Sequence, residues 1–244
     1  MEALILAGGF ATRLHPLTLD RAKPLLEVAG KPAIMHILER LFPLAERGLE
    51  RIIVVTNQRF ADDFRKALAG PFPVPVEVAS NGTMEPADKL GAIGDTYWGA
   101  RLLSGTTPFL VLAGDNLFDF DLNEVELVYS GQALVLLHRV DTLEEVKPYN
   151  NLRLDGTGRI LTFLEKPAKP FSKVFATCIY LFPPHVRGRL KQYLEEGRDP
   201  DKAGNFIRWL SQQEPVQTVT VEGAWFDIGS VATLQQAEAY FAGI

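Results

Sequence analysis

LILAGGFATRL, residues 4–14, passes from a short apolar run directly into two glycines, a threonine and an arginine. An apolar run of this length is typical of a strand buried on both faces, as in a parallel sheet covered by helices. In such a sheet, ligands bind beyond the carboxyl ends of the strands. The segment therefore predicts an α/β fold and places a binding loop at the end of its first strand.

The rest of the chain continues this pattern. Strands and helices alternate up to about residue 140, which predicts a doubly wound, mostly parallel, Rossmann-like sheet flanked by helices. Strands without full helices between them then predict a small mixed or antiparallel extension. The expected strands are Ala3–Ala7, Arg51–Thr56, Val74–Ala79, Phe109–Ala113, Ala133–His138, Leu152–Leu154, Ile160–Leu164, Phe175–Phe182 and Val216–Val221; the expected helices are Ala33–Arg47 (interrupted at Pro43), Phe60–Leu68, Ile93–Leu103, Leu122–Tyr129, His185–Glu195, Asn205–Gln212 and Val231–Phe241.

The composition excludes several classes of protein. The 244 residues are 47% hydrophobic with a net charge of −5 and no basic block, so a nucleic-acid partner is not expected. One cysteine, Cys178, can form neither an intrachain disulfide nor a cysteine-rich metal site. No apolar run approaches the roughly 20 residues of a membrane span, and the N-terminus does not resemble a signal peptide. We expect a cytoplasmic protein with one domain over residues 1–244 and no membrane partner.

The glycine loop has the chemistry of a phosphate-binding site. Gly8 and Gly9 let the backbone approach a ligand and expose its N–H groups, and Arg13 adds a permanent cation. Lys23 could supply a second cation. A tight turn with a surface arginine is the alternative. The loop has neither the G-x-G-x-x-G spacing of dinucleotide-binding proteins nor the Gly-Lys-Ser/Thr of a P-loop.

The longer stretch LILAGGFATRLHPLTLDRAKPLLEVAGKP, residues 4–32, resembles the signature of the sugar-1-phosphate nucleotidylyltransferases. The resemblance implies a GT-A-like nucleotidyltransferase fold in which Arg13 and Lys23 hold the triphosphate of a nucleoside triphosphate. Ala11 stands where the family usually has glycine, and a left-handed backbone there would be strained. The other residues implied to contact the nucleotide are Leu6, Ala7, Gly8, Gly9 and Thr12.

Two aspartates follow strand ends, in FLVLAGDNLF (residues 109–118) and WFDIGS (residues 225–230). Mg²⁺ binds few protein carboxylates and completes its shell with phosphate oxygens and water, so two converging aspartates would suit it. The alternative for Asp115 is a turn residue, and the alternatives for Asp227 are a helix cap or a structural salt bridge. Both match the metal-binding positions of the family, which implies a Mg²⁺ site.

The sugar side carries the triplet Glu165-Lys166-Pro167. A charged pair in a loop is often only solvated surface. By the resemblance, however, Lys166 binds the phosphate of a sugar 1-phosphate and Glu165 accepts hydrogen bonds from sugar hydroxyls. Tyr149 and Cys178 are implied near the same pocket, although Asn150 and Cys178 replace residues that many relatives share, and a core residue is the alternative for Cys178. Trp225 is a further candidate because it lies next to the Asp227 motif.

The nucleobase is expected near SNGTMEPADKLGAIGD, residues 80–95. Asn81 could pair with a base edge and Gly91 could let the base approach, while a polar loop followed by a helix start is the alternative. The resemblance favours dTTP or UTP with glucose 1-phosphate as substrates.

Two other functions remain open. A metal-dependent glycosyltransferase would carry an Asp-x-Asp motif, which Asp119-Phe120-Asp121 fits in letters, although Asp121 resembles a helix N-cap. A non-catalytic sensor of nucleotide sugars would tolerate the departures at Ala11, Asn150 and Cys178. Only 14 residues follow Ser230, so the C-terminal β-helix of some relatives is not expected. The sequence leaves the oligomeric state open, a homo-oligomer included.

Overall fold

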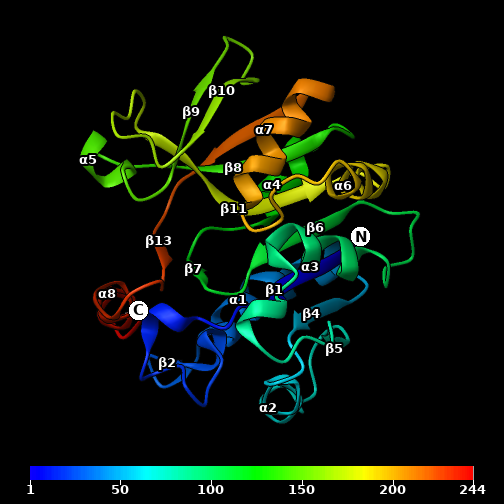
Figure 1. Ribbon diagram of the computed structural model, residues 1–244, viewed down its shortest axis with the longest axis vertical. Coiled ribbons are helices and arrows are strands. Elements are labelled where there is room, and N and C mark those ends of the chain that lie inside the picture. Colours follow the sequence, from blue (N-terminus) through cyan, green and yellow to red (C-terminus); the bar gives the residue numbers. More distant parts are fainter. Residues whose placement is uncertain (244) are drawn as a thin grey trace.

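The computed structural model describes residues 1–243, apart from the side chains of Glu124, Glu126 and Leu127. A seven-stranded sheet runs through the molecule (Figure 1) in the order β12-β8-β11-β6-β1-β4-β5. β11 runs antiparallel to both of its neighbours, and the other pairs are parallel. The strands are β1 (Glu2–Ala7), β4 (Ile52–Thr56), β5 (Val76–Ser80), β6 (Phe109–Ala113), β8 (Ala133–Arg139), β11 (Val174–Phe182) and β12 (Val216–Val221).

Helices cover both faces of this sheet because alternate residues of each strand point to opposite sides. Ile5 of β1 belongs to a core that includes residues of α1, α2, α4 and α8. Leu4 of the same strand belongs to the opposite core, with residues of α3, α6 and α7. The doubly wound, mostly parallel fold is therefore confirmed. The helices are α1 (Ala33–Leu41), α2 (Ala61–Ala67), α3 (Gly91–Ala100), α4 (Asn123–Val128), α6 (Val186–Glu195), α7 (Ala203–Gln213) and α8 (Val231–Phe241).

The long helix expected over residues 33–47 divides as Pro43 predicts. α1 ends at Leu41, and the chain continues as a 3₁₀ helix, Phe42–Arg47, with proline near its start. Gly48 then closes the segment with a φ of 88°, a conformation that glycine adopts without strain.

Smaller elements after residue 140 form the predicted extension. β9 (Asn150–Leu154) and β10 (Ile160–Glu165) pair antiparallel at the top of the molecule (Figure 1), next to the short helix α5 (Leu143–Val146). Three features were not expected from the sequence: α5, the pairing of β7 (Asn116–Phe118) with β13 (Trp225–Asp227), and the pairing of β2 (Glu27–Val28) with β3 (Lys31–Pro32). Segments of two to four residues are too short to show a period.

No helix among the described residues is long and apolar enough to cross a membrane. The expected single domain, residues 1–244, stays a prediction, and its last residue lies outside the described part of the chain. The sheet itself takes strands from both halves of the sequence.

Candidate active site

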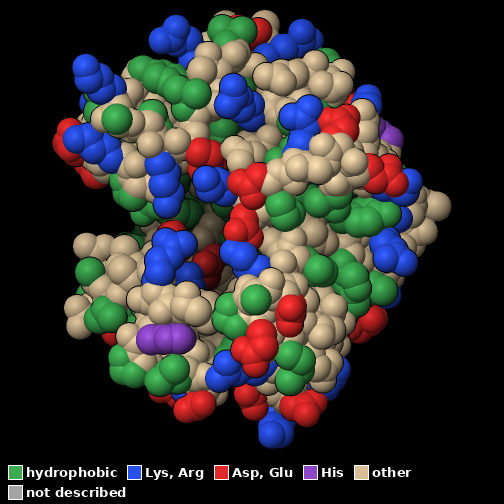
Figure 2. Space-filling view, viewed as in Figure 1, with side chains coloured by type: hydrophobic (Ala, Val, Ile, Leu, Met, Phe, Trp, Pro, Cys, Tyr) green, Lys and Arg blue, Asp and Glu red, His purple; other side chains and the backbone are tan. Residues whose placement is uncertain are grey.

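A cavity of about 440 Å³ opens where β1, β6 and β13 end and α3 begins, beside the middle of β11. Figure 2 shows a hollow in the surface with lysine and arginine side chains at its rim and acidic atoms deeper inside. The cavity lies at the carboxyl end of β1, where the sequence placed the binding loop. The predicted site residues that line it are Leu6, Ala7, Gly8, Gly9, Thr12, Arg13, Lys23, Gly91, Asp115, Cys178 and Asp227.

The glycine loop takes a defined shape after β1. Ala11 has a φ of 48° and a ψ of 37°, so the left-handed backbone considered for this residue is present. The Ala11 carbonyl accepts hydrogen bonds from Leu14 N (3.0 Å) and Thr18 Oγ1 (2.8 Å), which hold the bend. Residues Thr12–Leu14 then form a short 3₁₀ helix with Arg13 exposed at the cavity wall.

Lys23, Asp115 and Asp227 meet in the cavity although they come from distant parts of the chain. Lys23 Nζ donates to Asp115 Oδ2 at 2.7 Å. β13 pairs with β7 so that Asp227 lies opposite Asn116, and Ile228 N donates to the Asp115 carbonyl at 3.0 Å. A short strand pair thus fixes the two aspartates next to each other.

The environment of Asp227 fits a bound cation. Burial, together with the nearby Asp115 carboxylate, raises the pKa of Asp227 to about 6. The cations of Lys23, Arg13 and Lys166 lower this pKa, so they lie close enough to interact electrostatically with the Asp227 carboxylate. Asp227 Oδ1 is buried without a hydrogen-bond partner among the described residues. Two carboxylates with an unpartnered oxygen suit Mg²⁺, which takes its other ligands from phosphate and water. Among the side chains that the structure describes, there is no cluster of three metal-ligating groups.

The helix-cap alternative for Asp227 is wrong. Ser230 caps α8, with Thr233 N donating to Ser230 Oγ at 3.1 Å and Thr233 Oγ1 accepting from Ser230 N. The Asp227 carboxylate remains on the cavity side.

Cys178 reaches the cavity from an irregular part of β11. The pairing with β8 shifts register between Ala176 and Tyr180, and Cys178 has a φ of 58°. Asn150 fixes this bulge by exchanging two hydrogen bonds with Ala176 (2.7 and 3.1 Å). The asparagine that stands here in place of a common family residue therefore has a structural role. Burial raises the pKa of the Cys178 thiol to about 12, which keeps it protonated.

Four predicted sugar-side residues lie beside the cavity rather than in its wall: Tyr149, Glu165, Lys166 and Trp225. The Tyr149 and Trp225 rings meet edge to face with centroids 5.2 Å apart, and the Trp225 indole nitrogen is buried without a hydrogen-bond partner among the described residues. The Glu165 carboxylate packs against Gly204 in the first turn of α7, and burial raises its pKa. Lys166 follows with a φ of 43° and an exposed side chain.

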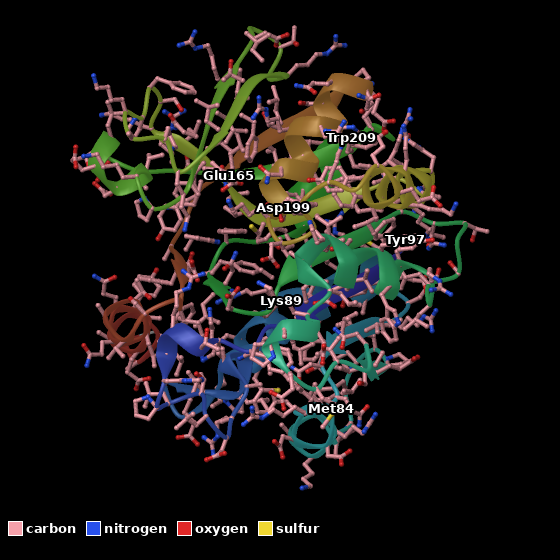
Figure 3. The ribbon with its side chains drawn as sticks, in the orientation of Figure 1. Met84, Lys89, Tyr97, Glu165, Asp199 and Trp209 are labelled. Atoms are coloured by element: carbon pink, nitrogen blue, oxygen red, sulfur yellow. The ribbon has the colours of Figure 1, made fainter. Side chains whose placement is uncertain are left out.

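At its α3 end the cavity is lined by residues that were not expected from the sequence. Asn81, which was expected near a base, is not part of the cavity wall, and it donates from Nδ2 to Asp95 Oδ1 at 2.6 Å. Asp95 lines the cavity one helical turn after Gly91, a spacing that could have indicated it. Figure 3 labels Lys89, which precedes α3 and lines the cavity, and Asp199, in the loop between α6 and α7, which does not. The other lining residues missed include Tyr180, Pro86, Lys89, Asp201 and Ala203.

The two aspartates of the Asp-x-Asp motif, Asp119 and Asp121, have structural roles. Asp119 Oδ1 accepts a hydrogen bond from Ala224 N at 2.7 Å, and Asp119 Oδ2 accepts one from the Tyr240 hydroxyl. Asp121 Oδ1 accepts from Asn123 N (2.8 Å) at the start of α4, as expected of a capping residue. Neither aspartate lines the cavity, which argues against the glycosyltransferase alternative.

Comparisons with known proteins agree with this geometry. The sequence model of the nucleotidyl transferase family matches residues 2–242. The catalytic subunit beta of a mannose-1-phosphate guanylyltransferase from Drosophila melanogaster is 30% identical over 93% of this chain and 59% of its own length. A UTP–glucose-1-phosphate uridylyltransferase from Synechocystis sp. is 29% identical over 97% of this chain and 62% of its own. The chain thus spans about three fifths of these relatives.

A solved structure also shares the fold along the whole chain. It is a Bacillus anthracis protein described as a glucose-1-phosphate thymidylyltransferase, in complex with sucrose, with 25% identity and a TM-score of 0.86 over 100% of this chain and 96% of that one. With the family match over nearly every residue, and with the glycine loop, Lys23 and two aspartates around one cavity, this chain belongs to the nucleotidyl transferase family.

Proposed function

We propose that this protein transfers a nucleotidyl group from a nucleoside triphosphate to a sugar 1-phosphate, giving an NDP-sugar and pyrophosphate. One observation carries the proposal: the cations Arg13 and Lys23 and the carboxylates Asp115 and Asp227 line the same cavity as the glycine loop. The cavity is large enough for a nucleotide with part of a sugar, since ligand pockets of this kind usually measure about 300–1,000 Å³.

The chemistry needs positioning more than proton transfer. The oxygen of a sugar phosphate is already an anionic nucleophile, so no general base is required. It attacks the α-phosphorus, and the bond to the β-phosphate oxygen breaks as pyrophosphate leaves. Arg13 and Lys23 stabilise the negative charge on the departing pyrophosphate. Lys166, at the sugar side, offsets the repulsion between the incoming phosphate and the triphosphate.

Asp115 and Asp227 are the residues that would hold Mg²⁺. When bound, the ion supplies Lewis-acid stabilisation of the phosphate charge. The unpartnered Asp227 Oδ1 and the adjacent Asp115 carboxylate would provide oxygen ligands for it. Lys23 already occupies one oxygen of Asp115, at 2.7 Å, so the lysine and a cation would share this carboxylate.

The sugar is expected to lie against Glu165, Tyr149, Trp225 and Cys178. The half-buried Glu165 carboxylate, held by α7, can accept hydrogen bonds from two neighbouring sugar hydroxyls. The aromatic group beside Asp227 gives the pocket an apolar wall. Glucose 1-phosphate remains the sequence-based expectation, and relatives that use mannose 1-phosphate by name make this sugar the second candidate.

The direct test is Mg²⁺-dependent pyrophosphate release with all common nucleoside triphosphates crossed with a panel of sugar 1-phosphates. Asp115→Asn and Lys166→Ala should each lower the rate by about 100-fold or more. The control is Asp119→Asn, which makes the same change of charge as Asp115→Asn. Asp119 lies outside the cavity, so this variant should retain the activity. Nucleotide binding without pyrophosphate release from any pair would overturn the proposal in favour of a regulatory nucleotide-sugar sensor.

A further inference from the structure

Asp95 presents a carboxylate to the cavity that neither the fold nor the proposed reaction accounts for. The residue is only 6% exposed, yet it forms part of the cavity wall. Asn81 Nδ2 donates to Oδ1 at 2.6 Å, and no other hydrogen bond to this carboxylate is present among the described residues. Oδ2 lies so close to Gly8 that a Cβ on residue 8 would be 2.3 Å away. A glycine in the binding loop therefore makes room for this oxygen.

The two ends of the cavity differ in charge. Arg13 and Lys23 lie at the end that contains Asp115 and Asp227, where phosphates can be neutralised. At the α3 end the carboxylates are Asp95 and Asp201, and the lysine there, Lys89, forms an ion pair with Asp201. A phosphate would be repelled from this end, whereas a neutral group with hydrogen-bond donors would be favoured. On the proposed function, that group is the nucleobase.

We propose that Asp95 reads the Watson–Crick edge of the nucleobase and selects guanine. An ionised carboxylate only accepts hydrogen bonds. Guanine offers it two neighbouring donors, N1–H and N2–H₂. Oδ2 can accept one of them, and the second lone pair of Oδ1, beside the Asn81 bond, can accept the other. Uracil and thymine offer a single N3–H between two carbonyl oxygens, and adenine and cytosine place an amino group next to an acceptor nitrogen. Guanine alone among the common bases thus avoids an acceptor facing the carboxylate.

This inference rests on the proposed function and departs from the sequence-based expectation of dTTP or UTP. Burial raises the pKa of Asp95 to about 6, and the hydrogen bond from Asn81 lowers it, so the group is ionised at neutral pH. The Asn81 bond also orients the carboxylate, which leaves Oδ2 toward Gly8 and the cavity. Asn81 is then a positioning residue, one step removed from the base.

The test compares binding of GTP, inosine triphosphate, UTP and dTTP by titration calorimetry in Mg²⁺ at pH 7.5. Inosine triphosphate keeps N1–H but lacks the 2-amino group, so it isolates one of the two hydrogen bonds. The wild-type protein should bind GTP about 10-fold more tightly than inosine triphosphate and than UTP or dTTP. Asp95→Asn replaces one acceptor by a donor, which should abolish the difference between GTP and inosine triphosphate and strengthen UTP and dTTP by about 5-fold. Asp141→Asn, an exposed residue outside the cavity, should keep the wild-type order.

Two results with the wild-type protein would overturn the role of Asp95: equal affinity for GTP and inosine triphosphate, or a preference for a pyrimidine nucleotide. Either result would leave the proposed reaction unaffected. That comparison needs no variant, so it holds even if Asp95→Asn does not fold. Folded protein that binds no triphosphate would overturn the proposed function itself.

Discussion

Lys23 Nζ lies 2.7 Å from Asp115 Oδ2, although 92 positions separate the two residues in the chain. Both side chains are partly buried, with 15% and 32% of their surfaces exposed. The pair joins the segment that follows the glycine loop to the end of β6 and places a cation on one of the two aspartates. The site is therefore held together in part by the same charges that are proposed to act on the substrate.

Replacing Lys23 by methionine keeps most of the volume of the side chain but removes its charge. We expect pyrophosphate release to fall by about 100-fold, because one charged donor toward the leaving group is lost. Lys23→Arg should recover part of the rate, since it keeps the charge with a different geometry. Initial rates at saturating nucleotide would measure this, and full activity of Lys23→Met would contradict a role for Lys23 in phosphate binding.

Gly91 cannot accept a side chain. It has a φ of 77°, and a Cβ would lie 2.6 Å from the Pro200 carbonyl oxygen, which also accepts a hydrogen bond from Ile93 N. We expect Gly91→Ala to lower the free energy of unfolding by more than about 2 kcal/mol and to weaken nucleotide binding. Gly82→Ala is the matched control, with a φ of 84° but open space around its Cβ, and should show only the backbone cost of about 1–2 kcal/mol. Urea unfolding of both variants measures the difference, and equal losses would contradict the clash.

Glu2 is an acid whose hydrogen bonds depend on ionisation. Burial by itself raises its pKa, but hydrogen bonds from Ser104 and Arg51 outweigh this effect, and the pKa lies below the ordinary 4.5. Its contribution to stability is therefore complete above about pH 4.5 and is lost as the pH falls through the lowered pKa of the folded state. Glu2→Gln should cost about 1–3 kcal/mol at pH 7 and much less at pH 3.

The control for this change is Glu77→Gln. Glu77 contacts the same Arg51 at 3.5 Å but leaves 53% of its side chain exposed, so its loss should cost less than about 0.5 kcal/mol. Denaturant unfolding at the two pH values decides the outcome, and a Glu2→Gln penalty that does not change with pH would exclude the carboxylate as its source.

Asp95 should behave in the opposite way. Burial raises its pKa from 3.8 to about 6, so the folded protein holds this proton more tightly and loses stability as the pH rises through this interval. In the absence of nucleotide, Asp95→Asn should therefore stabilise the protein by about 1–3 kcal/mol at pH 7.5 and have little effect near pH 4. Thermal unfolding across this range is the measurement. Destabilisation at both pH values would instead identify Asp95 as an anchor for Asn81.

The sequence by itself determined the parts of this protein that depend on local chemistry. The apolar run of β1 and its glycines placed the loop, Pro43 divided the helix that follows Pro32, and Ser230 marked the start of α8. These signals lie within a few residues of the structure they specify. Four spaced motifs in order also indicated the family that residues 2–242 match.

Only the tertiary structure decided which charged groups meet. The three-residue strands β7 and β13 are too short for a periodic signal, yet their pairing brings Asp227 next to Asp115. The bulge that turns Cys178 into the cavity depends on Asn150, which lies on another strand. The protonation and role of a carboxylate such as Asp95 are set by neighbours that the sequence places far away, because burial and electrostatic interactions depend on distance in space rather than along the chain.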